Sequence, residues 1–374
     1  MKRFEEICVV GDGAFGVVTK CRDKETGDIF AIKKMKQRYA TFDECLQLKE
    51  VKSLRKIKHE NVIRLLQVFR ENDHLYLVFE FIPDGSLLKT IQSHNGPFSE
   101  PEIRFVMAQL FEGLNYTHRQ GFFHRDIKPE NILWSGDVLK IGDYGLAREI
   151  RSRPPYTEYV STRWYRAPEI VLHHEFYNSP VDIWAAGCIM AELFTLKPLF
   201  QGASETDQLF KICSIMGTPG QGNWPDGLRL ATRLGIRLPQ SAPTPLACVI
   251  PNASSEAIDL LKELLQLDPA KRLNATQALQ HPFFKGDRCP VGQTVPKRIV
   301  TQEPPLQPEP EKPKVSTVEP TQNVVGSNSS IPQNPIHSSM ASSIGATSGL
   351  GSRMPRHPFE RTDPEFDDLF DDLL

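Results

Sequence analysis

The segment from His124 to Asn131 reads HRDIKPEN and places charged and amide side chains close together. An aspartate in this pattern can accept a hydroxyl proton, and a nearby lysine can neutralise a phosphoryl group in transit. We therefore predict that Asp126 and Lys128 are catalytic and that Asn131 binds a metal ion. His124 is expected to make structural hydrogen bonds rather than to act as the base.

A second acidic group lies in the triplet Asp143-Tyr144-Gly145, directly after a predicted short strand, Leu139–Ile141. We expect Asp143 to chelate magnesium ions that bridge phosphate groups. Gly145 would permit the backbone to turn after the aspartate. The triplet alone also occurs in ordinary turns, so its meaning depends on the other groups.

The segment from Gly11 to Val17 reads GDGAFGV, a G-x-G-x-x-G-x-V pattern between two predicted strands. Glycine lets the backbone approach phosphates where a side chain would collide. Alone, the pattern also fits an ordinary turn or a dinucleotide fingerprint, although strands on both sides argue against a Rossmann unit. The residues expected to bind ATP here are Gly11, Asp12, Gly13, Ala14, Phe15, Gly16, Val17 and Val18.

Lys33 ends the third predicted strand, and Glu50 lies in the helix predicted to follow it. A lysine held by a carboxylate can bind the α- and β-phosphates of a nucleotide, so both residues are assigned to ATP binding and Lys33 also to catalysis. A surface ion pair is the alternative, and Glu44 is a less favoured partner because it occupies a helix-capping position. The four groups in this order predict phosphoryl transfer with ATP and Mg²⁺ as cofactors.

Two kinds of element must position these groups. β-Branched and aromatic residues cluster in five predicted strands: Cys8–Val10, Val17–Arg22, Ile29–Lys33, Val62–Phe69 and Leu75–Phe81. One helix, residues 42–57, is predicted among them, with a capping box from Thr41 and Glu44. After Gly85 the apolar period becomes helical, with a helix starting at Ser99 and a buried central helix at Asp182–Phe194.

Composition excludes several classes of protein. Of the 374 residues, 40% are hydrophobic and 24% charged, which is typical of a globular chain. A net charge of −2 gives no general attraction to nucleic acid or acidic membranes. The seven cysteines include no C-x-x-C pair, and the longest apolar run, Ile183–Met190, is too short to span a bilayer. We therefore expect a soluble, intracellular protein with no nucleic-acid partner and no membrane span.

With these motifs in place, the chain resembles the eukaryotic protein kinases from Phe4 to Phe284. The run VSTRWYRAPE at residues 160–169 is similar to the group of cyclin-dependent and mitogen-activated kinases. Within that group, runs such as GFFHRD at residues 121–126 and PPYTEYVST at residues 154–162 resemble the male germ cell-associated and intestinal cell kinases.

The resemblance implies an α+β bilobal kinase fold. A small β-rich N-lobe would comprise residues 4–82 and a larger helical C-lobe residues 83–284, with ATP between them. Phe79 would be the gatekeeper, and Glu80 and Ile82 would bind ATP from the hinge. It further implies that Glu169 pairs with Arg272 and that Asp182 supports the catalytic loop. Tyr144 departs from the usual phenylalanine and needs a hydroxyl partner if buried.

Two phosphorylation sites, Thr157 and Tyr159, are expected to activate the enzyme through an upstream kinase. Glu158 departs from the usual aspartate of the subfamily, which leaves the identity of that kinase open. The residues expected to bind the phosphates are Lys49, Arg125 and Arg148 for Thr157, and Arg163 and Arg166 for Tyr159. Alternatively, these arginines are solvated or pair with Glu149 and Glu158.

By the same resemblance, Arg166 would bind a backbone carbonyl near Val160. That carbonyl could then not accept a hydrogen bond from the N–H of the substrate residue that follows the phosphoacceptor. Proline has no such N–H, and an unsatisfied donor costs about 1–3 kcal/mol, so protein substrates with Ser/Thr-Pro sites are expected. Thr162 would hydrogen-bond the catalytic loop.

Residues 285–374 are rich in Pro, Ser and Gln and are predicted to be a disordered tail. Its last segment, Phe359–Leu374, combines acids with Phe and Leu, which suits either a docking partner or a solvated end. The family resemblance implies a cytoplasmic location, with the cilium or flagellum and the nucleus as further sites, and a role in cilium length control and intraflagellar transport. A pseudokinase and a small-molecule kinase of related fold are the alternatives.

Overall fold

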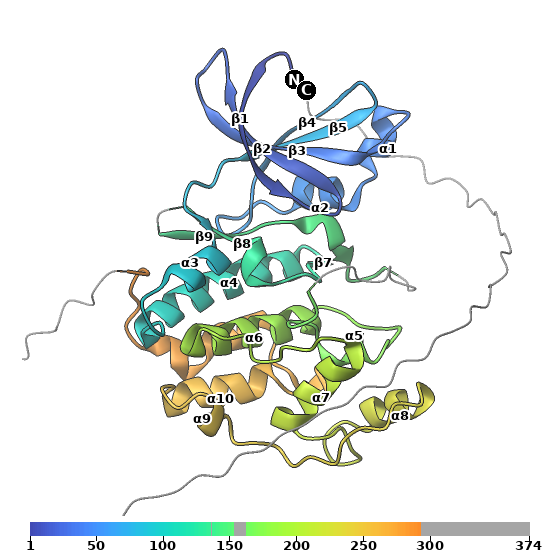
Figure 1. Cartoon of the computed structure of the whole chain (residues 1–374), viewed down its shortest axis with the longest axis vertical. Coiled ribbons are helices and arrows are strands. Elements are labelled where there is room, and N and C mark those ends of the chain that lie inside the picture. The colour runs from blue at the N-terminus through green and yellow to red at the C-terminus, as the bar shows by residue number, and fades with distance from the viewer. Residues whose placement is uncertain (136, 153–161, 293–374) are drawn as a thin grey trace, which may run out of the picture. The chain divides into compact units, whose positions relative to one another are not determined.

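The small lobe is built on one five-stranded antiparallel sheet (Figure 1). The computed structural model describes residues 1–135, 137–152 and 162–292, all within one compact unit, Met1–Val300. The strands, in the order β1-β2-β3-β5-β4, are β1 Phe4–Asp12, β2 Gly16–Asp23, β3 Ile29–Arg38, β4 Leu65–Glu71 and β5 His74–Glu80. The five predicted strands are confirmed, except that β4 begins at Leu65 rather than Val62, which forms only an isolated bridge with Ile141.

The single helix predicted for residues 42–57 is wrong, because the structure has two helices, α1 Phe42–Leu46 and α2 Lys49–Lys56. Leu46 and Leu48 both pack against the core. Residues two apart lie on nearly opposite sides of an α-helix, so a break lets both leucines face inward. The predicted capping box forms in part: Thr41 Oγ1 accepts from the Glu44 N–H at 3.2 Å, while the Glu44 carboxylate accepts from the Ala40 N–H.

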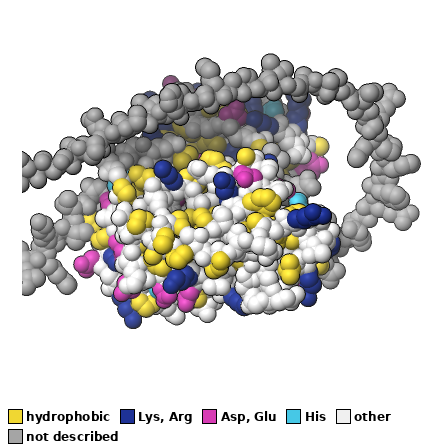
Figure 2. Space-filling model, turned by 60° about the horizontal axis from the view of Figure 1, so that its bottom comes forward, with side chains coloured by type: hydrophobic (Ala, Val, Ile, Leu, Met, Phe, Trp, Pro, Cys, Tyr) yellow, Lys and Arg dark blue, Asp and Glu magenta, His cyan; other side chains and the backbone are white. Residues whose placement is uncertain are grey.

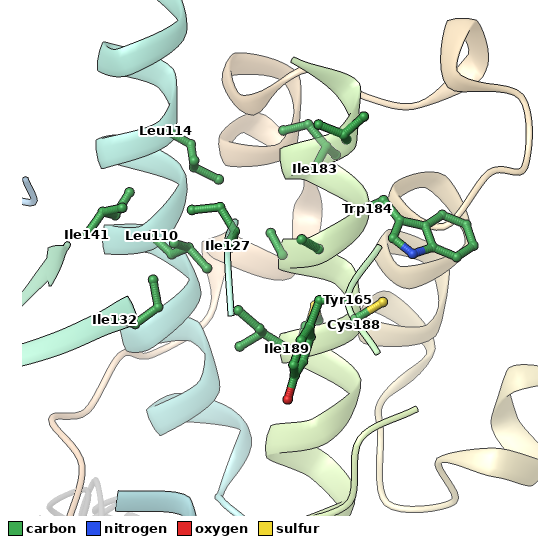
Figure 3. Close-up of a cluster of buried hydrophobic side chains, with 14 of the residues drawn as sticks. Leu110, Leu114, Ile127, Ile132, Ile141, Tyr165, Ile183, Trp184, Cys188 and Ile189 are labelled. Atoms are coloured by element: carbon green, nitrogen blue, oxygen red, sulfur yellow. The ribbon is translucent and has the colours of Figure 1, made fainter. Parts of the chain in front are cut away.

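The large lobe is organised around two long helices, α4 Glu100–Arg119 and α6 Pro180–Thr195. Ser99 and Glu102 mark the start of α4 as predicted, and every residue of α6 from Val181 to Phe194 is buried. Figure 3 shows Ile127 lying between Leu110 of α4 and Ile189 of α6, so the segment containing Asp126 is anchored in this core.

The remaining elements are short. The helices are α3 Leu87–Ser93, α5 Pro168–Val171, α7 Glu205–Met216, α8 Pro225–Arg233, α9 Leu246–Val249, α10 Ser255–Leu264 and α11 Ala275–Gln280. The 3₁₀ turns are η1 Pro129–Asn131, η2 Tyr144–Leu146, η3 Pro269–Lys271 and η4 Pro282–Lys285. The strands are β6 Gly85–Ser86, β7 Phe122–Phe123, β8 Ile132–Ser135, β9 Val138–Ile141 and β10 Arg148–Glu149.

The two lobes share one continuous apolar core, which confirms the predicted bilobal α+β fold. Backbone hydrogen bonds from Ile63 N to Ile141 O and from Ile141 N to Asn61 O, both 2.9 Å, join the segment before β4 to β9. On the face of the large lobe in Figure 2, apolar and charged side chains are interspersed. All seven cysteines are free thiols. In the described ranges, no helix combines the length and apolar character needed to cross a bilayer.

Candidate active site

A cavity of about 720 Å³ lies between the sheet of the small lobe and the segment around β8. This volume is within the usual range for small-molecule sites. Phe79, the predicted gatekeeper, lines it, as do the predicted hinge residues Glu80 and Ile82. The Glu80 carboxylate itself accepts from the Arg64 N–H at 2.8 Å and pairs with Lys140 at 3.1 Å.

The glycine-rich segment borders this cavity. The residues of the segment that line it are Gly11, Asp12, Gly13, Ala14, Phe15, Gly16 and Val18. Val17 is not placed there, because successive side chains of a strand point to opposite faces. A Cβ on Gly13 would meet nothing closer than 3.8 Å, so this backbone leaves open space for a ligand. Gly16 has a different reason to be glycine, since a Cβ there would lie 2.6 Å from Lys34 O.

The predicted ion pair between Lys33 and Glu50 is present and buried. Lys33 Nζ lies 2.9 Å from both carboxylate oxygens of Glu50 and 3.1 Å from Asp143 Oδ1. Although burial by itself disfavours the ammonium form, the carboxylates of Glu50 and Asp143 raise the pKa of Lys33 above its usual value. Lys33 is therefore a permanent cation at the edge of the cavity.

Asp143 remains an anion in this setting. Burial favours its protonated form, but the Lys33 ammonium holds the pKa of Asp143 below its usual value. Its side chain is 42% exposed and lines the cavity together with Asn131. The hydrogen bond from Gly142 N to Asn131 O, 2.8 Å, ties the two segments together.

These two residues fit a magnesium ion that is bound jointly with a nucleotide. In the part of the chain that the structure describes, no group of three or more His, Cys, Asp or Glu residues could hold a metal alone. Magnesium commonly uses one or two carboxylates and completes its shell with substrate phosphates and water. The anionic Asp143 and the amide of Asn131, at the edge of one cavity, meet that requirement.

The catalytic-loop residues meet at the Asp126 carboxylate. Lys128 Nζ donates to Asp126 Oδ2 at 2.9 Å, and Asn131 Nδ2 donates to the same oxygen at 3.1 Å and to Asp126 O at 2.8 Å. The predicted structural role of His124 is confirmed: its ring is fully buried and bonds Gly142 O at 2.8 Å. The Asp126 N–H donates to His124 Nδ1 at 3.2 Å, which fixes the backbone of the catalytic aspartate.

Asp182 supports this loop from α6, as predicted. Its carboxylate accepts hydrogen bonds from the N–H groups of His124 and Arg125, both at 2.8 Å. Arg125 has a φ of 77°, a left-handed conformation that is costly for a residue with a side chain. The charged acceptor offsets that cost and holds the turn before Asp126.

The Asp143-Tyr144-Gly145 triplet differs from prediction in one respect. The residue with a left-handed backbone is Asp143, with φ of 55°, rather than Gly145. A Cβ on Gly145 would lie 3.2 Å from Asp143 Oδ1, so a larger residue there would require that carboxylate to shift by a few tenths of an ångström. The buried Tyr144 hydroxyl finds its partner in Thr117 Oγ1 at 2.8 Å.

The expected regulatory residues lie partly outside the described residues, among them Thr157, Glu158, Tyr159 and the carbonyl near Val160. The predicted phosphate-binding residues are spread over several elements: Lys49 starts α2, Arg125 precedes Asp126, Arg148 is in β10, and Arg163 and Arg166 precede α5. Their grouping around a phosphate stays a prediction.

Two of these arginines have partners in the structure. Arg125 Nη2 donates to the Tyr177 hydroxyl at 2.5 Å, and Arg166 Nη1 donates to Glu205 Oε1 at 3.3 Å. Thr162 lines a small cavity with Asp126 and Lys128, and its hydrogen bond to the catalytic loop stays a prediction.

Several residues at the main cavity were not predicted. They include Ala31, Ile63, Glu130 and Leu133. Ala31 could have been found, because it is two residues from Lys33 in the same strand and therefore faces the same side. Ile63 and Glu130 gave no such signal, because their positions depend on how the two lobes pack.

A comparison with family models matches residues 4–284 to the protein kinase domain. "Serine/threonine-protein kinase ICK" of Mus musculus is 54% identical to this chain over 76% of this chain and 45% of its own length. "Serine/threonine-protein kinase MAK" of Homo sapiens is 48% identical over 86% of this chain and 52% of its own length. "Cyclin-dependent kinase F-4" of Oryza sativa subsp. japonica is 51% identical over 76% of this chain and 62% of its own length. The chain thus spans about half the length of these mammalian relatives.

Proposed function

This chain belongs to the protein kinase domain family, and from that premise we propose that it transfers the γ-phosphoryl group of ATP to serine and threonine hydroxyls of other proteins. The observation that carries the proposal is the set of contacts joining Lys33, Glu50 and Asp143 at the cavity, with Asp126 and Lys128 in contact in the adjoining loop. The relatives named as serine/threonine-protein kinases support this choice of acceptor.

Each residue has one task in this scheme. Lys33, held by Glu50, would bind the α- and β-phosphates, and the glycine-rich segment would cover them. Asp126 would accept the proton of the attacking hydroxyl, and Lys128 would balance charge on the phosphoryl group. Magnesium held by Asn131 and Asp143 would supply charge neutralisation between the phosphates.

A direct test uses the full chain, Mg-ATP and peptides with a single acceptor. We expect phosphorylation of serine and threonine peptides and none of sugars or choline, which are substrates of small-molecule kinases. Exchange of Lys33→Met should reduce kcat/KM for ATP by at least roughly a hundredfold, because the buried cation that binds phosphate is lost. Unchanged turnover in the Lys33→Met protein would refute the proposed site.

The proposal extends to substrates with proline after the acceptor. Arg166 is buried and its Nη1 donates to Glu205 Oε1 at 3.3 Å, which holds in place the guanidinium that would bind a neighbouring backbone carbonyl. A stranded N–H costs about 1–3 kcal/mol, so Ser-Pro peptides should exceed matched Ser-Ala peptides in kcat/KM by roughly tenfold to a hundredfold. Equal kcat/KM values for the two peptides would refute the proposed preference for proline but would not contradict the proposed kinase activity.

Activation by phosphorylation of Thr157 and Tyr159 is also proposed, with an upstream kinase as partner. Support comes from Arg125 and Arg148, which lie on the catalytic loop and on β10. Mass spectrometry of active and phosphatase-treated protein shows whether the phosphate is present. In a kinase assay, the phosphatase-treated protein and the Thr157→Ala variant should both be at least tenfold less active than the phosphorylated protein.

The resemblance to the male germ cell-associated and intestinal cell kinases leads us to propose a location in the cytoplasm, the cilium or flagellum and the nucleus. A role in cilium length and intraflagellar transport is part of the same proposal. Imaging a tagged chain in ciliated cells, with and without residues 285–374, would test both the location and a docking role for the tail. A chain excluded from cilia in both forms would refute the location.

A further inference from the structure

The outer face of α2 carries a row of cations. With α-helical geometry of about 100° per residue, Lys49, Lys52, Arg55 and Lys56 fall on one side of the helix, and all four are exposed. The opposite side consists of the buried residues Glu50, Val51, Ser53 and Leu54. We call the exposed set the basic face of α2.

These cations have little compensation from the protein itself. Within the residues that the structure describes, Lys49, Lys52 and Arg55 form no side-chain hydrogen bond or ion pair, and Lys56 lies over the Phe122 ring at 5.6 Å. The residues three or four positions from Lys52 are Leu48, Lys49, Arg55 and Lys56, so its helical neighbours add like charge. Like charges at this spacing destabilise a helix.

A role in stabilising the helix does not account for the row. Cations are favourable in the last turn, which explains Arg55 and Lys56, but unfavourable near the N-terminus, where Lys49 stands as the first residue. The N-cap residue, Leu48, also provides no side-chain hydrogen bond. Positive charge therefore lies at Lys49 and Lys52, where the isolated helix would be more stable without it.

We propose that the basic face of α2 binds an acidic peptide segment of a partner protein. The row from Lys49 to Lys56 extends about 10 Å along the helix, which corresponds to roughly three or four residues of an extended peptide. A chain with a net charge of −2 lacks the wide positive field expected of a nucleic-acid-binding protein, so a short carboxylate-rich peptide is the better match.

The location gives such binding a consequence for the active site. α2 carries Glu50, whose carboxylate holds Lys33 at 2.9 Å, and the helix also packs against η2, which follows Asp143. A bound partner would therefore sit on the helix that positions the phosphate-binding lysine. A phosphate on Thr157 is expected near Lys49, so Lys49 is not used to test the proposal.

The experiment measures binding of a fluorescein-labelled octaglutamate peptide to the full chain by fluorescence anisotropy at low salt. We expect the double variant Lys52→Glu/Arg55→Glu to weaken binding at least tenfold. The control Lys197→Glu/Lys211→Glu makes the same change in net charge at two exposed positions of the large lobe and should bind like the unmodified chain. Thermal unfolding of all three proteins establishes that they are folded.

Three outcomes would overturn the proposal. The first is no saturable binding by the unmodified chain, the second is equal weakening of binding in both double variants, and the third is tighter binding of an eight-nucleotide RNA than of the peptide to the same face. Since the assay contains no ATP and measures no phosphotransfer, its failure is distinguishable from failure of the proposed kinase activity.

Discussion

At the scale of single residues, the buried charges are neutralised by partners from distant parts of the chain. Lys33 contacts Glu50 and also Asp143, which lies 110 residues after Lys33. Asp182 receives hydrogen bonds from the loop that precedes Asp126. Such contacts set the charge state of each group, and they make the charge at the cavity a property of the folded protein.

Glu192 provides a residue-level test through pH. It is 2% exposed, and burial raises its pKa to about 7, while the Tyr165 hydroxyl donates to it at 2.7 Å. The folded state therefore retains a proton that the unfolded chain releases above pH of about 4.5, so stability falls as pH rises toward 7. From pH 5 to pH 8, we expect the titration of Glu192 to reduce the free energy of unfolding by roughly 2–3 kcal/mol.

The Glu192→Gln variant should lack that pH-dependent loss. Urea unfolding at pH 5 and 8 measures it, with the difference between the two pH values compared for variant and unmodified protein. If both proteins lose the same free energy of unfolding across this range, Glu192 does not titrate as described.

The local motifs were predictable at this scale because their residues are neighbours in sequence. Asp126, Lys128 and Asn131 lie within six positions, and the structure joins them by hydrogen bonds. The contact of Asp143 with Lys33 was not predicted, because it depends on how two distant elements pack. The same holds for the pairing of Glu192 with Tyr165.

At the scale of elements, turns and short strands present the site residues, while α4 and α6 hold these turns in place. The connection from α6 to the catalytic loop runs through Asp182, whose carboxylate also bonds His118 Nε2 at 2.9 Å. Although burial opposes ionisation, the hydrogen bond and charge of His118 hold the pKa of Asp182 below its usual value.

Replacing this anion should loosen the loop. We expect Asp182→Asn to reduce the free energy of unfolding by about 2–3 kcal/mol at pH 7, because two buried N–H groups lose a charged acceptor. The native advantage of Asp182 is present above its unfolded pKa and is lost as pH falls, so the difference between the proteins should shrink below a pH of about 4. Chemical denaturation at several pH values measures this, and a constant difference would contradict it.

Elements were predictable where a single pattern dominated. The five strands of the small lobe and the buried α6 follow from clustered β-branched residues and a continuous apolar run. The break between α1 and α2 was missed, because it arises from Leu46 and Leu48 both reaching the core, and the sequence period alone permits a continuous helix.

At the scale of the whole described molecule, a buried ion pair braces the large lobe. Arg272 and Glu169 are 103 residues apart and form two hydrogen bonds, at 2.6 and 2.7 Å, with side chains almost fully buried. Arg272 also donates to Gln266 O and lies over the Trp184 ring. This contact, which the family resemblance predicted, connects the start of α5 to η3 across α6.

Removing the charge of one partner of this pair should reduce the free energy of unfolding far more than replacing both partners by apolar residues. We expect Glu169→Gln to lower the free energy of unfolding by about 3–5 kcal/mol, since Arg272 then remains buried without its counter-charge. The double variant Glu169→Leu/Arg272→Met should lose less free energy of unfolding than Glu169→Gln. Guanidinium chloride unfolding of the three proteins measures this, and a double variant less stable than Glu169→Gln would show that the pair stabilises the lobe beyond its own charge balance.

The central claim is that Asp126 accepts the hydroxyl proton during phosphoryl transfer from ATP. Its most direct test compares the full chain with its Asp126→Asn variant, using radiolabelled Mg-ATP and a Ser-Pro peptide, with ATP affinity and thermal unfolding measured as controls. We expect kcat to fall at least about a hundredfold while ATP affinity and stability stay close to those of the unmodified chain. An Asp126→Asn protein that retains full phosphotransfer would contradict the claim.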